Sequence, residues 1–374
     1  MHSLTNDRHR VLHVITPSRM AGAETFLARL LRRTADDGSI AHCCISSHSP
    51  ANSEMRSAGI KFETLGIGGK ANPLAVPRLA EAARRHAVDL LHSHLSTASW
   101  WCGWLEQFGG PPSIGHVHGF TSALWHRRQT HLIACSSAVK NDLIEKGVPG
   151  ERITVMHYPV DPHDMRATSS PAAIRSELGA SADTPVVGTF AHLSLKKGYR
   201  ELVRAAENVL RRMPAAQFWC FGAGPLRQEL QATAAAYGIA DRFKLFGFRR
   251  DVPSLMRAID VMCLPSHREP FGLVYVEAAL AEKPVIACNA GGAPEIIEHG
   301  ETGLLVPPPS AGNAPALAEA VLTILQNRDR ARAMGRRGHE LALARFGWQR
   351  YLIQLQALYE RLLDVNSPSL RKAA

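Results

Sequence analysis

The chain has 374 residues, of which 45% are hydrophobic and 20% are charged, and its formal net charge is +10. This composition is typical of a globular protein long enough for two domains, and it excludes a disordered chain. The positive charge favours an anionic partner such as a nucleotide, a phosphorylated glycan or an acidic lipid headgroup. Nucleic acid is not expected, because the arginines are dispersed over helical segments and no nucleic-acid-binding motif accompanies them.

The seven cysteines are scattered through apolar segments without a C-x-x-C pair, which indicates reduced thiols rather than disulfides or a zinc site. No apolar run reaches the roughly 18 residues that span a bilayer, and the first ten residues are not followed by an apolar leader. We therefore expect a cytoplasmic protein that touches a membrane, if at all, peripherally on its inner face.

Short apolar runs alternate with helical patterns along the first half of the chain. Strands are expected at 11–16, 41–46, 89–94, 113–118, 132–137 and 153–158. Helices are expected between several of them, notably at 24–34, 77–86 and 138–146. Apolar strands that alternate with helices are typical of a parallel sheet covered on both faces.

The second half repeats the pattern. Strands are expected there at 185–191, 217–222, 243–248, 260–266, 284–289 and 303–308. Two such arrays predict an α/β fold of two Rossmann-like, doubly wound domains, at 1–165 and 183–345, whose carboxyl strand ends face a central cleft. The segment 161–184, rich in Ser, Ala and Pro, is the expected linker, and a last helix at 349–363 is expected to pack back on the first domain.

Two glutamates lie eight positions apart in SHREPFGLVYVEA, one on each side of a Pro-Phe-Gly turn. Glu269 is expected on a loop, and Glu277 inside the helix that begins near Leu273. The free backbone N–H groups at Phe271, Gly272 and Leu273 would form an anion site between them. A nucleoside diphosphate sugar fits this layout, with hexose hydroxyls at Glu269 and ribose hydroxyls at Glu277. The alternative is a capping acid followed by a surface glutamate.

Other strand-to-helix turns carry residues suited to the same ligand. Gly22 follows the first strand and would let a ligand approach the backbone closely. Lys197 and His192 follow the first strand of the second half and suit a diphosphate, and Gly222 lies in the next turn. The alternative for Gly22 is an ordinary turn glycine, and the alternative for the segment with Lys197 is a solvated basic turn.

Seven segments in this order resemble the retaining GT-B glycosyltransferases of family 4, the glycosyl transferases group 1: MAGAE, HVHGF, IACSSAVKNDLIEKGVPGERITVMHYPVD, FAHLSLKKG, FGAGP, SHREPFGLVYVEA and AGGAPEII with GETGLLVPP. The resemblance covers nearly the whole chain. It implies retaining transfer of a hexose-type sugar from a UDP- or GDP-linked donor to a glycan or lipid-linked acceptor, in the synthesis of surface polysaccharide or lipopolysaccharide.

The resemblance also implies roles for individual residues. Glu269 resembles the glutamate that faces the donor sugar, and Glu277 the one that holds the ribose. Lys197 resembles the lysine that pairs with the diphosphate, and Gly22 the glycine loop that closes on it. His118 in HVHGF resembles the histidine that reaches the transferred sugar.

By the same resemblance, Gly222 and the Phe-Gly-Phe segment before Arg249 would flank the nucleoside. One departure concerns the diphosphate, because Ala191 and His192 stand where the family has Gly-Arg before the lysine. Histidine carries fewer donors than arginine and titrates near neutral pH, so turnover would be slower or pH-dependent. A non-catalytic nucleotide-sugar or glycan-binding homologue is therefore one alternative, and a GT-B phosphorylase or epimerase is another.

His92 with His94 and His116 with His118 form two H-x-H pairs. Alternate strand residues share a face, so each pair could chelate zinc. No glutamate or cysteine at ligand spacing accompanies them, and the chain has no D-x-D motif. The sequence therefore predicts no metal and no other cofactor, and protein groups alone would stabilise the leaving diphosphate.

Overall fold

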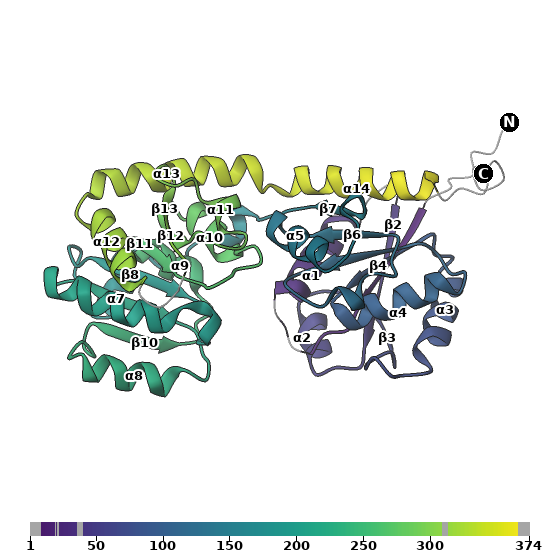
Figure 1. Ribbon diagram of the computed structural model, residues 1–374, viewed down its shortest axis with the longest axis horizontal. Helices are drawn as coiled ribbons and strands as arrows, with labels where there is room; N and C mark the ends of the chain where they lie inside the picture. Colours follow the sequence, from purple (N-terminus) through teal and green to yellow (C-terminus); the bar gives the residue numbers. More distant parts are fainter. Residues whose placement is uncertain (1–8, 19, 21, 36–39, 309–312, 366–374) are drawn as a thin grey trace. The chain divides into compact units, whose positions relative to one another are not determined.

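The computed structural model describes residues 9–18, 20, 22–35, 40–308 and 313–365. Two compact units divide the chain (Figure 1). The first contains the described residues up to His157 and those from Leu352 onward, and the second runs from Tyr158 to Tyr351. The division therefore falls before the expected boundary at 165, and the last helix, α14 (Trp348–Val365), gives most of its length to the first unit.

The first unit is built around a parallel sheet. Within the described residues its strands are β1 (His9–Ile15), β2 (Ile40–Ser47), β3 (Glu63–Leu65), β4 (Leu90–His94), β5 (Ser113–Val117), β6 (His131–Ala134) and β7 (Ile153–Val155). They lie in the order β3-β2-β1-β4-β5-β6-β7. Its helical segments are α1 (Gly22–Arg33), α2 (Ala51–Ser57), α3 (Ala75–Arg85), α4 (Ser96–Gln107), η1 (Ala123–Trp125), α5 (Ser137–Glu145) and η2 (Gly150–Arg152).

Alternation along the strands gives this sheet two different faces. Leu12 and Val14 of β1 and Leu91 of β4 point to one face and pack into a core with Leu79 of α3 and Trp101 of α4. Successive strand residues point to opposite sides, so the residues between these leucines and valines face the other way. That second face carries a row of histidines.

The second unit has a parallel sheet of its own. Its described strands are β8 (Val186–Phe190), β9 (Gln217–Phe221), β10 (Phe243–Gly247), β11 (Val261–Leu264), β12 (Val285–Cys288) and β13 (Gly303–Val306), in the order β10-β9-β8-β11-β12-β13. Its helical segments are η3 (Pro162–Met165), α6 (Pro171–Glu177), η4 (Leu195–Lys197), α7 (Tyr199–Arg212), α8 (Arg227–Ala236), α9 (Val252–Ala258), α10 (Leu273–Leu280), α11 (Ala293–Ile296), α12 (Ala314–Leu325) and α13 (Arg328–Arg345).

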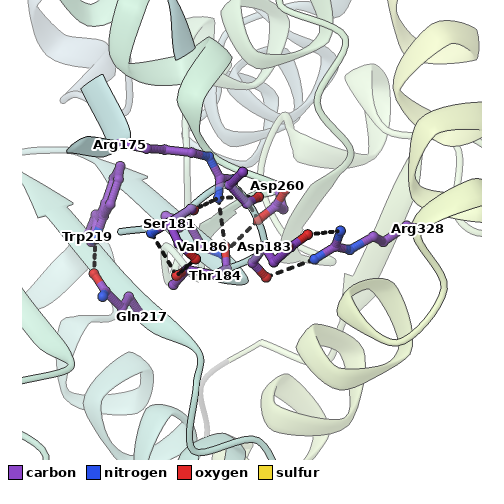
Figure 2. Close-up of polar contacts among 10 residues, drawn as sticks. Arg175, Ser181, Asp183, Thr184, Val186, Gln217, Trp219, Asp260 and Arg328 are labelled. Carbon is purple, nitrogen blue, oxygen red and sulfur yellow. Dashed lines mark hydrogen bonds and ion pairs between the residues drawn. The ribbon is translucent and has the colours of Figure 1, made fainter. Parts of the chain in front are cut away.

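The segment 161–184, expected as a linker, is an ordered part of the second unit, and Arg175 of α6 shows why (Figure 2). Its guanidinium Nη1 donates to backbone carbonyls that include that of Thr184, and its Nη2 lies 2.9 Å from Oδ2 of Asp260. The same Oδ2 accepts from the backbone N–H of Val186, where β8 begins. An arginine with this many partners fixes the segment to the amino edge of the sheet, which a composition rich in Ser, Ala and Pro did not indicate.

The described residues contain no helix with the length and apolar character needed to cross a membrane. All seven cysteines lie in the described part of the chain, and all are free thiols. Six are buried and Cys43 is half-buried. Burial raises the pKa of the Cys44 thiol to about 12, so this group is protonated at neutral pH.

Candidate active site

A salt bridge joins two loops at the carboxyl edge of the second sheet. Lys197 ends η4 after β8, and Glu269 lies in the loop after β11. Lys197 Nζ is 2.6 Å from Glu269 Oε2, and the two side chains are only 18% and 13% exposed. Ser266 Oγ donates to the same carboxylate oxygen at 3.0 Å. Burying a charged pair of this kind costs desolvation free energy. The pair offers a ligand both a cation and an anion at one point.

Backbone contacts fix the position of both side chains. Gly198 has φ +72°, and a Cβ there would lie 1.9 Å from the carbonyl oxygen of Pro265. The N–H of His267 donates to the carbonyl of Lys196 at 2.9 Å. The turn that carries Lys197 therefore packs directly on the chain leading to Glu269. Glycine is required at 198 because any side chain would separate the two loops.

The loop after β12 closes on the same place. The N–H of Gly292 donates to the carbonyl oxygen of Glu269 at 2.8 Å. A Cβ on Gly291 would lie 2.0 Å from that oxygen, and Gly291 also has φ +62°. Strands β8, β11 and β12 are neighbours in the sheet, so the three loops meet where parallel strands present their ligand sites.

Helix α10 begins beside Glu269. Gly272 precedes it with φ +103° and ψ +57°, and no side chain caps the helix start. The Phe271 ring is 2% exposed and meets the rings of Tyr158 and Phe346 edge-to-face, at centroid distances of 5.6 Å in both cases. Phe271 therefore anchors the turn through its side chain and offers a ligand only its backbone. The uncapped N–H groups and the helix dipole favour an anion here.

Glu277 lies in the middle of α10 and is half-buried. Leu273, the first residue of the helix, is also half-buried. The prediction of a loop glutamate followed by a helical glutamate is therefore confirmed for the local structure. The role of Glu277 in holding a ribose stays a prediction.

The loops after β8 and β9 also interlock. His192 is exposed, and its carbonyl accepts from the N–H of Ser194 at 2.8 Å. Gly222 has φ +146°, and a Cβ there would lie 2.0 Å from the carbonyl oxygen of Ala191. The N–H of Gly222 donates to the carbonyl of Gly247 at 2.7 Å, which joins the end of β10 to the same group. His192 and Gly222 therefore lie in adjoining loops, on the side of β8 away from β11.

Each nitrogen of the Arg249 guanidinium group has a protein partner. Its Nε and Nη2 donate to the Asp251 carboxylate at 2.8 and 2.6 Å, and Nη1 donates to Glu177 at 2.7 Å. The hydrogen bonds to Asp251 and Glu177 raise the pKa of Arg249. The neighbouring Phe248 ring is 72% exposed, so the Phe-Gly-Phe segment offers a stacking surface that Arg249 itself does not. A direct contact between Arg249 and a nucleoside stays a prediction.

Two predicted residues belong to the first unit. Gly22 is the first residue of α1, and a Cβ there would meet no atom within 4 Å. His118 follows β5, is half-buried, and has Nε2 3.2 Å from Nδ1 of His94. Burial lowers the pKa of His118 to about 3, with a smaller contribution from His126. His118 is therefore neutral at pH 7, and it would serve as a hydrogen-bonding group rather than as a cation.

Two family models match this chain. The model described as Glycosyltransferase Family 4 matches residues 20–164, and the one described as Glycosyl transferases group 1 matches residues 172–341. The chain belongs to the group 1 glycosyltransferases. Most of the first match falls in the first unit, up to residue 157, and the second match falls in the second unit, which contains the Lys197–Glu269 pair.

Named relatives of this glycosyltransferase act on different molecules. Alpha-D-kanosaminyltransferase of Streptomyces kanamyceticus is 24% identical over 80% of this chain and 84% of its own length. A GDP-mannose-dependent phosphatidylinositol monomannoside mannosyltransferase of Mycobacterium tuberculosis is 34% identical over 44% of this chain and 45% of its own length.

The crystal structure of Anabaena HepE in complex with UDP-glucose is similar to this glycosyltransferase with a TM-score of 0.81. The two chains are 25% identical, and the match covers 94% of this chain and 99% of HepE. The predicted α/β fold with two Rossmann-like domains is thereby confirmed, and it is the GT-B fold of these enzymes. The chain is a glycosyltransferase by family, fold and relatives.

Sequence reasoning missed one residue of the site. Ser266, whose hydroxyl holds Glu269, was quoted in the motif without a role. Its position three residues before the glutamate on a loop was the available signal, since a serine hydroxyl at that spacing reaches a nearby carboxylate.

Proposed function

We propose that this glycosyltransferase moves a hexose-type sugar from a nucleoside diphosphate sugar to a glycan or lipid-linked acceptor, with retention of configuration and without a metal ion at the donor. UDP- and GDP-linked sugars are the proposed donors. HepE, crystallised with UDP-glucose, and the GDP-mannose-dependent relative support this class of donor.

The observation that carries the proposal is the Lys197–Glu269 pair beside the uncapped start of α10. One N–H of the Lys197 ammonium is directed to Glu269 at 2.6 Å, which leaves two further N–H donors for phosphate oxygens. The backbone N–H groups of α10 add a second positive contribution from the helix end. Glu269 is proposed to accept hydrogen bonds from the sugar hydroxyls, and Glu277 from the ribose.

In the proposed reaction the bond between the anomeric carbon and the phosphate oxygen breaks, and a bond from that carbon to an acceptor oxygen forms. The electron pair of the broken bond stays on the diphosphate. Lys197 and the α10 N–H groups stabilise this charge as preorganised donors in a partly shielded place. The acceptor proton passes to an oxygen of the departing diphosphate, so no protein side chain acts as the general base.

His192 is proposed to assist Lys197 in place of the family arginine. Its exposed position in the loop after β8 allows contact with a bound phosphate. A histidine offers at most two N–H donors where an arginine offers five, so its help would be weaker than that of the family arginine. His118 and Gly22 are proposed to act on the sugar and the diphosphate from the first unit, as the family resemblance implies.

The acceptor is proposed to belong to surface polysaccharide or lipopolysaccharide synthesis, and the enzyme to work in the cytoplasm at the inner face of the membrane. The net charge of +10 supports an anionic acceptor or membrane surface.

Nucleotide release from a panel of UDP-, GDP- and ADP-sugars, with EDTA present and donor binding followed in parallel, tests the proposal. Release from one donor despite EDTA, with the anomeric configuration of the product read by NMR, supports metal-independent retaining transfer and identifies the donor. Loss of turnover in EDTA with an unchanged thermal midpoint contradicts the metal-free mechanism. Binding without release under any acceptor mixture contradicts the enzymatic role and favours a nucleotide-sugar-binding homologue.

A further inference from the structure

A cluster of histidines covers one face of the first sheet. Strand alternation places them together, since β1 pairs with β4 in the register His13 with His92, and β4 pairs with β5 in the register His94 with His116. These side chains lie on the face opposite the Leu12 and Val14 core. The cluster consists of His13, His42, His92, His94, His116 and His118.

Three members of the cluster converge on one point. His13, His92 and His94 are each 0% exposed, and each offers a ring nitrogen such that the three nitrogens lie within 4.8 Å of one another. His13 Nδ1 and His94 Nε2 are 3.1 Å apart. Two nitrogens that bind zinc at about 2.0–2.1 Å in a tetrahedral arrangement lie roughly 3.3 Å apart. This spacing therefore suits a metal ion as well as a shared proton.

His92 supplies an independent observation. Its Nε2 is buried and has no hydrogen-bond partner among the described residues, whereas its Nδ1 lies 2.5 Å from the hydroxyl of Tyr359 on α14. A buried ring nitrogen without a partner lowers stability unless something binds it. The centroid of the His92 ring is 5.0 Å from that of His13 and 4.5 Å from that of His94, so the ring with the unmet nitrogen stands beside both other members of the convergent group.

The opposite ring nitrogens of all three histidines are held. His13 Nε2 lies 2.9 Å from His42 Nδ1, His94 Nδ1 lies 3.2 Å from His118 Nε2, and His92 Nδ1 contacts Tyr359. Histidines that bind a metal usually have their second nitrogen hydrogen-bonded in this way, which fixes the ring orientation and the tautomer. The hydrogen bonds to the opposite ring nitrogens, and not only the three converging nitrogens, therefore match a metal site.

We propose that His13, His92 and His94 bind a transition-metal ion of the zinc type through His13 Nδ1, His92 Nε2 and His94 Nε2. Imidazole nitrogens favour zinc and its neighbours over magnesium or calcium, and three histidines with a water molecule as fourth ligand is a known zinc coordination. The ion would clamp β1 to β4 and, through Tyr359, hold the part of α14 that belongs to the first unit. The site is separate from the Lys197–Glu269 pair and lends nothing to the metal-free step proposed there.

His94, His116 and His118 form a second group of three nitrogens within 4.8 Å of one another. The first group is favoured because all three of its members are fully buried, whereas His118 is only half-buried. His92, whose Nε2 has no partner among the described residues, also belongs to the first group.

The test uses the full chain, purified without a histidine tag, stripped with chelator and titrated with cobalt(II) or zinc(II) salts. We expect one cobalt per chain with the visible d–d absorption of a tetrahedral site, displaced by zinc, and a thermal midpoint that rises with zinc because the ion binds the folded state. An unmodified protein that shows neither the absorption nor the zinc-dependent rise overturns the proposal.

Three variants locate the ion. His92→Gln retains a side chain of similar size, and we expect it to lose the cobalt absorption and the zinc-dependent rise in thermal midpoint. His126→Gln is the matched control, since His126 is also buried with unmet ring nitrogens but belongs to neither metal group, and it should bind cobalt like the unmodified protein. Tetrahedral absorption that survives in His92→Gln, or that His116→Gln abolishes while His92→Gln does not, overturns the assignment.

Discussion

Nζ of Lys197 lies 2.6 Å from Oε2 of Glu269, although 72 residues separate the two in the chain. The Gly198 turn and the Gly291–Gly292 turn hold the two backbones in contact. Backbone contacts at glycines that leave no room for a side chain therefore position the pair. Its geometry does not depend on the two flexible side chains alone.

Lys197→Met and Glu269→Gln should each lower turnover at least about tenfold, because each removes a preorganised charge from the proposed donor site. Steady-state nucleotide release measures the effect, and circular dichroism with the thermal midpoint checks folding. Lys196→Met is the matched control, since Lys196 is the exposed neighbour in the same turn, and it should stay within about twofold of the unmodified enzyme. Full activity in both site variants would show that the pair is structural only.

Gly198→Ala should destabilise the second unit by roughly 2–5 kcal/mol, since the added Cβ would lie 1.9 Å from a carbonyl oxygen at a φ of +72°. Gly238→Ala measures the cost of placing a side chain at a positive φ without a clash, because Gly238 has a similar φ of +67° and no atom lies within 4 Å of its Cβ position. That control should cost about 1–2 kcal/mol. Urea unfolding compares the two, and equal losses would mean that the contact with Pro265 relaxes at no cost.

Gly22→Ala and Gly22→Val should leave stability nearly unchanged, because a Cβ at Gly22 meets no atom within 4 Å. If a diphosphate approaches this backbone, both variants should lower kcat/KM for the donor, by about tenfold or more for valine. Donor titrations of initial rate measure the effect. A valine variant with unchanged kcat/KM would remove Gly22 from the donor site.

Arg175→Met should lower the free energy of unfolding by about 2–4 kcal/mol, since it removes the cation that pairs with the Asp260 carboxylate and leaves several carbonyls without this donor. Arg328 of α13 supplies the control seen in Figure 2, where it pairs with Asp183. The Arg328 and Asp183 side chains are 56% and 90% exposed, so Arg328→Met should cost less than about 1 kcal/mol. Chemical denaturation of both variants decides whether the segment 161–184 is anchored as described.

Acid should weaken the first unit, and His131 is one cause. The ring is buried, its Nε2 lies 2.8 Å from Thr154 Oγ1, and burial followed by the charges of Arg361, Arg152 and Lys140 lowers its pKa to about 4. The unfolded state takes up this proton near pH 6.5, so the stabilisation is complete above that value and falls as the pH drops toward about 4.

His131→Asn should flatten the pH dependence of the unfolding free energy in this window by up to about 1.4 kcal/mol per pH unit. The measurement is a urea-unfolding series from about pH 7.5 to about pH 4.5, which brackets the unfolded value near 6.5. His163→Asn, at an exposed position, is the control and should leave the slope unchanged. An identical slope in His131→Asn would show that His131 is not the group that takes up the proton.

Elements with a strong local pattern were predictable from the sequence. Every strand expected in the two halves exists within a few residues of its predicted bounds, because a continuous apolar run between turn residues leaves few alternatives. The three-residue β3 (Glu63–Leu65) and the tryptophan-rich α4 (Ser96–Gln107) were not predicted. The first is too short to show a pattern, and the second lacks a polar face because both of its sides are covered.

Glu269 and Glu277 show how much of a site can be predicted from short sequence patterns. Their placement on a loop and on a helix follows from Pro, Gly and helix-forming residues nearby, and the structure agrees. The contact of Glu269 with Lys197 was not predicted from spacing, since it depends on β8 and β11 being neighbours in the sheet. The same is true of His13, which joins His92 and His94 only because β1 pairs with β4.

The sequence by itself determined the fold class, the alternation of strands and helices, and the short motifs that mark the family, because these depend on composition and on periodicities of a few residues. Only the tertiary structure decided which loops touch, which charges pair, and which histidines share a face. Those relationships depend on strand order and register, which bring residues far apart in the chain to within hydrogen-bonding distance and which no local pattern encodes.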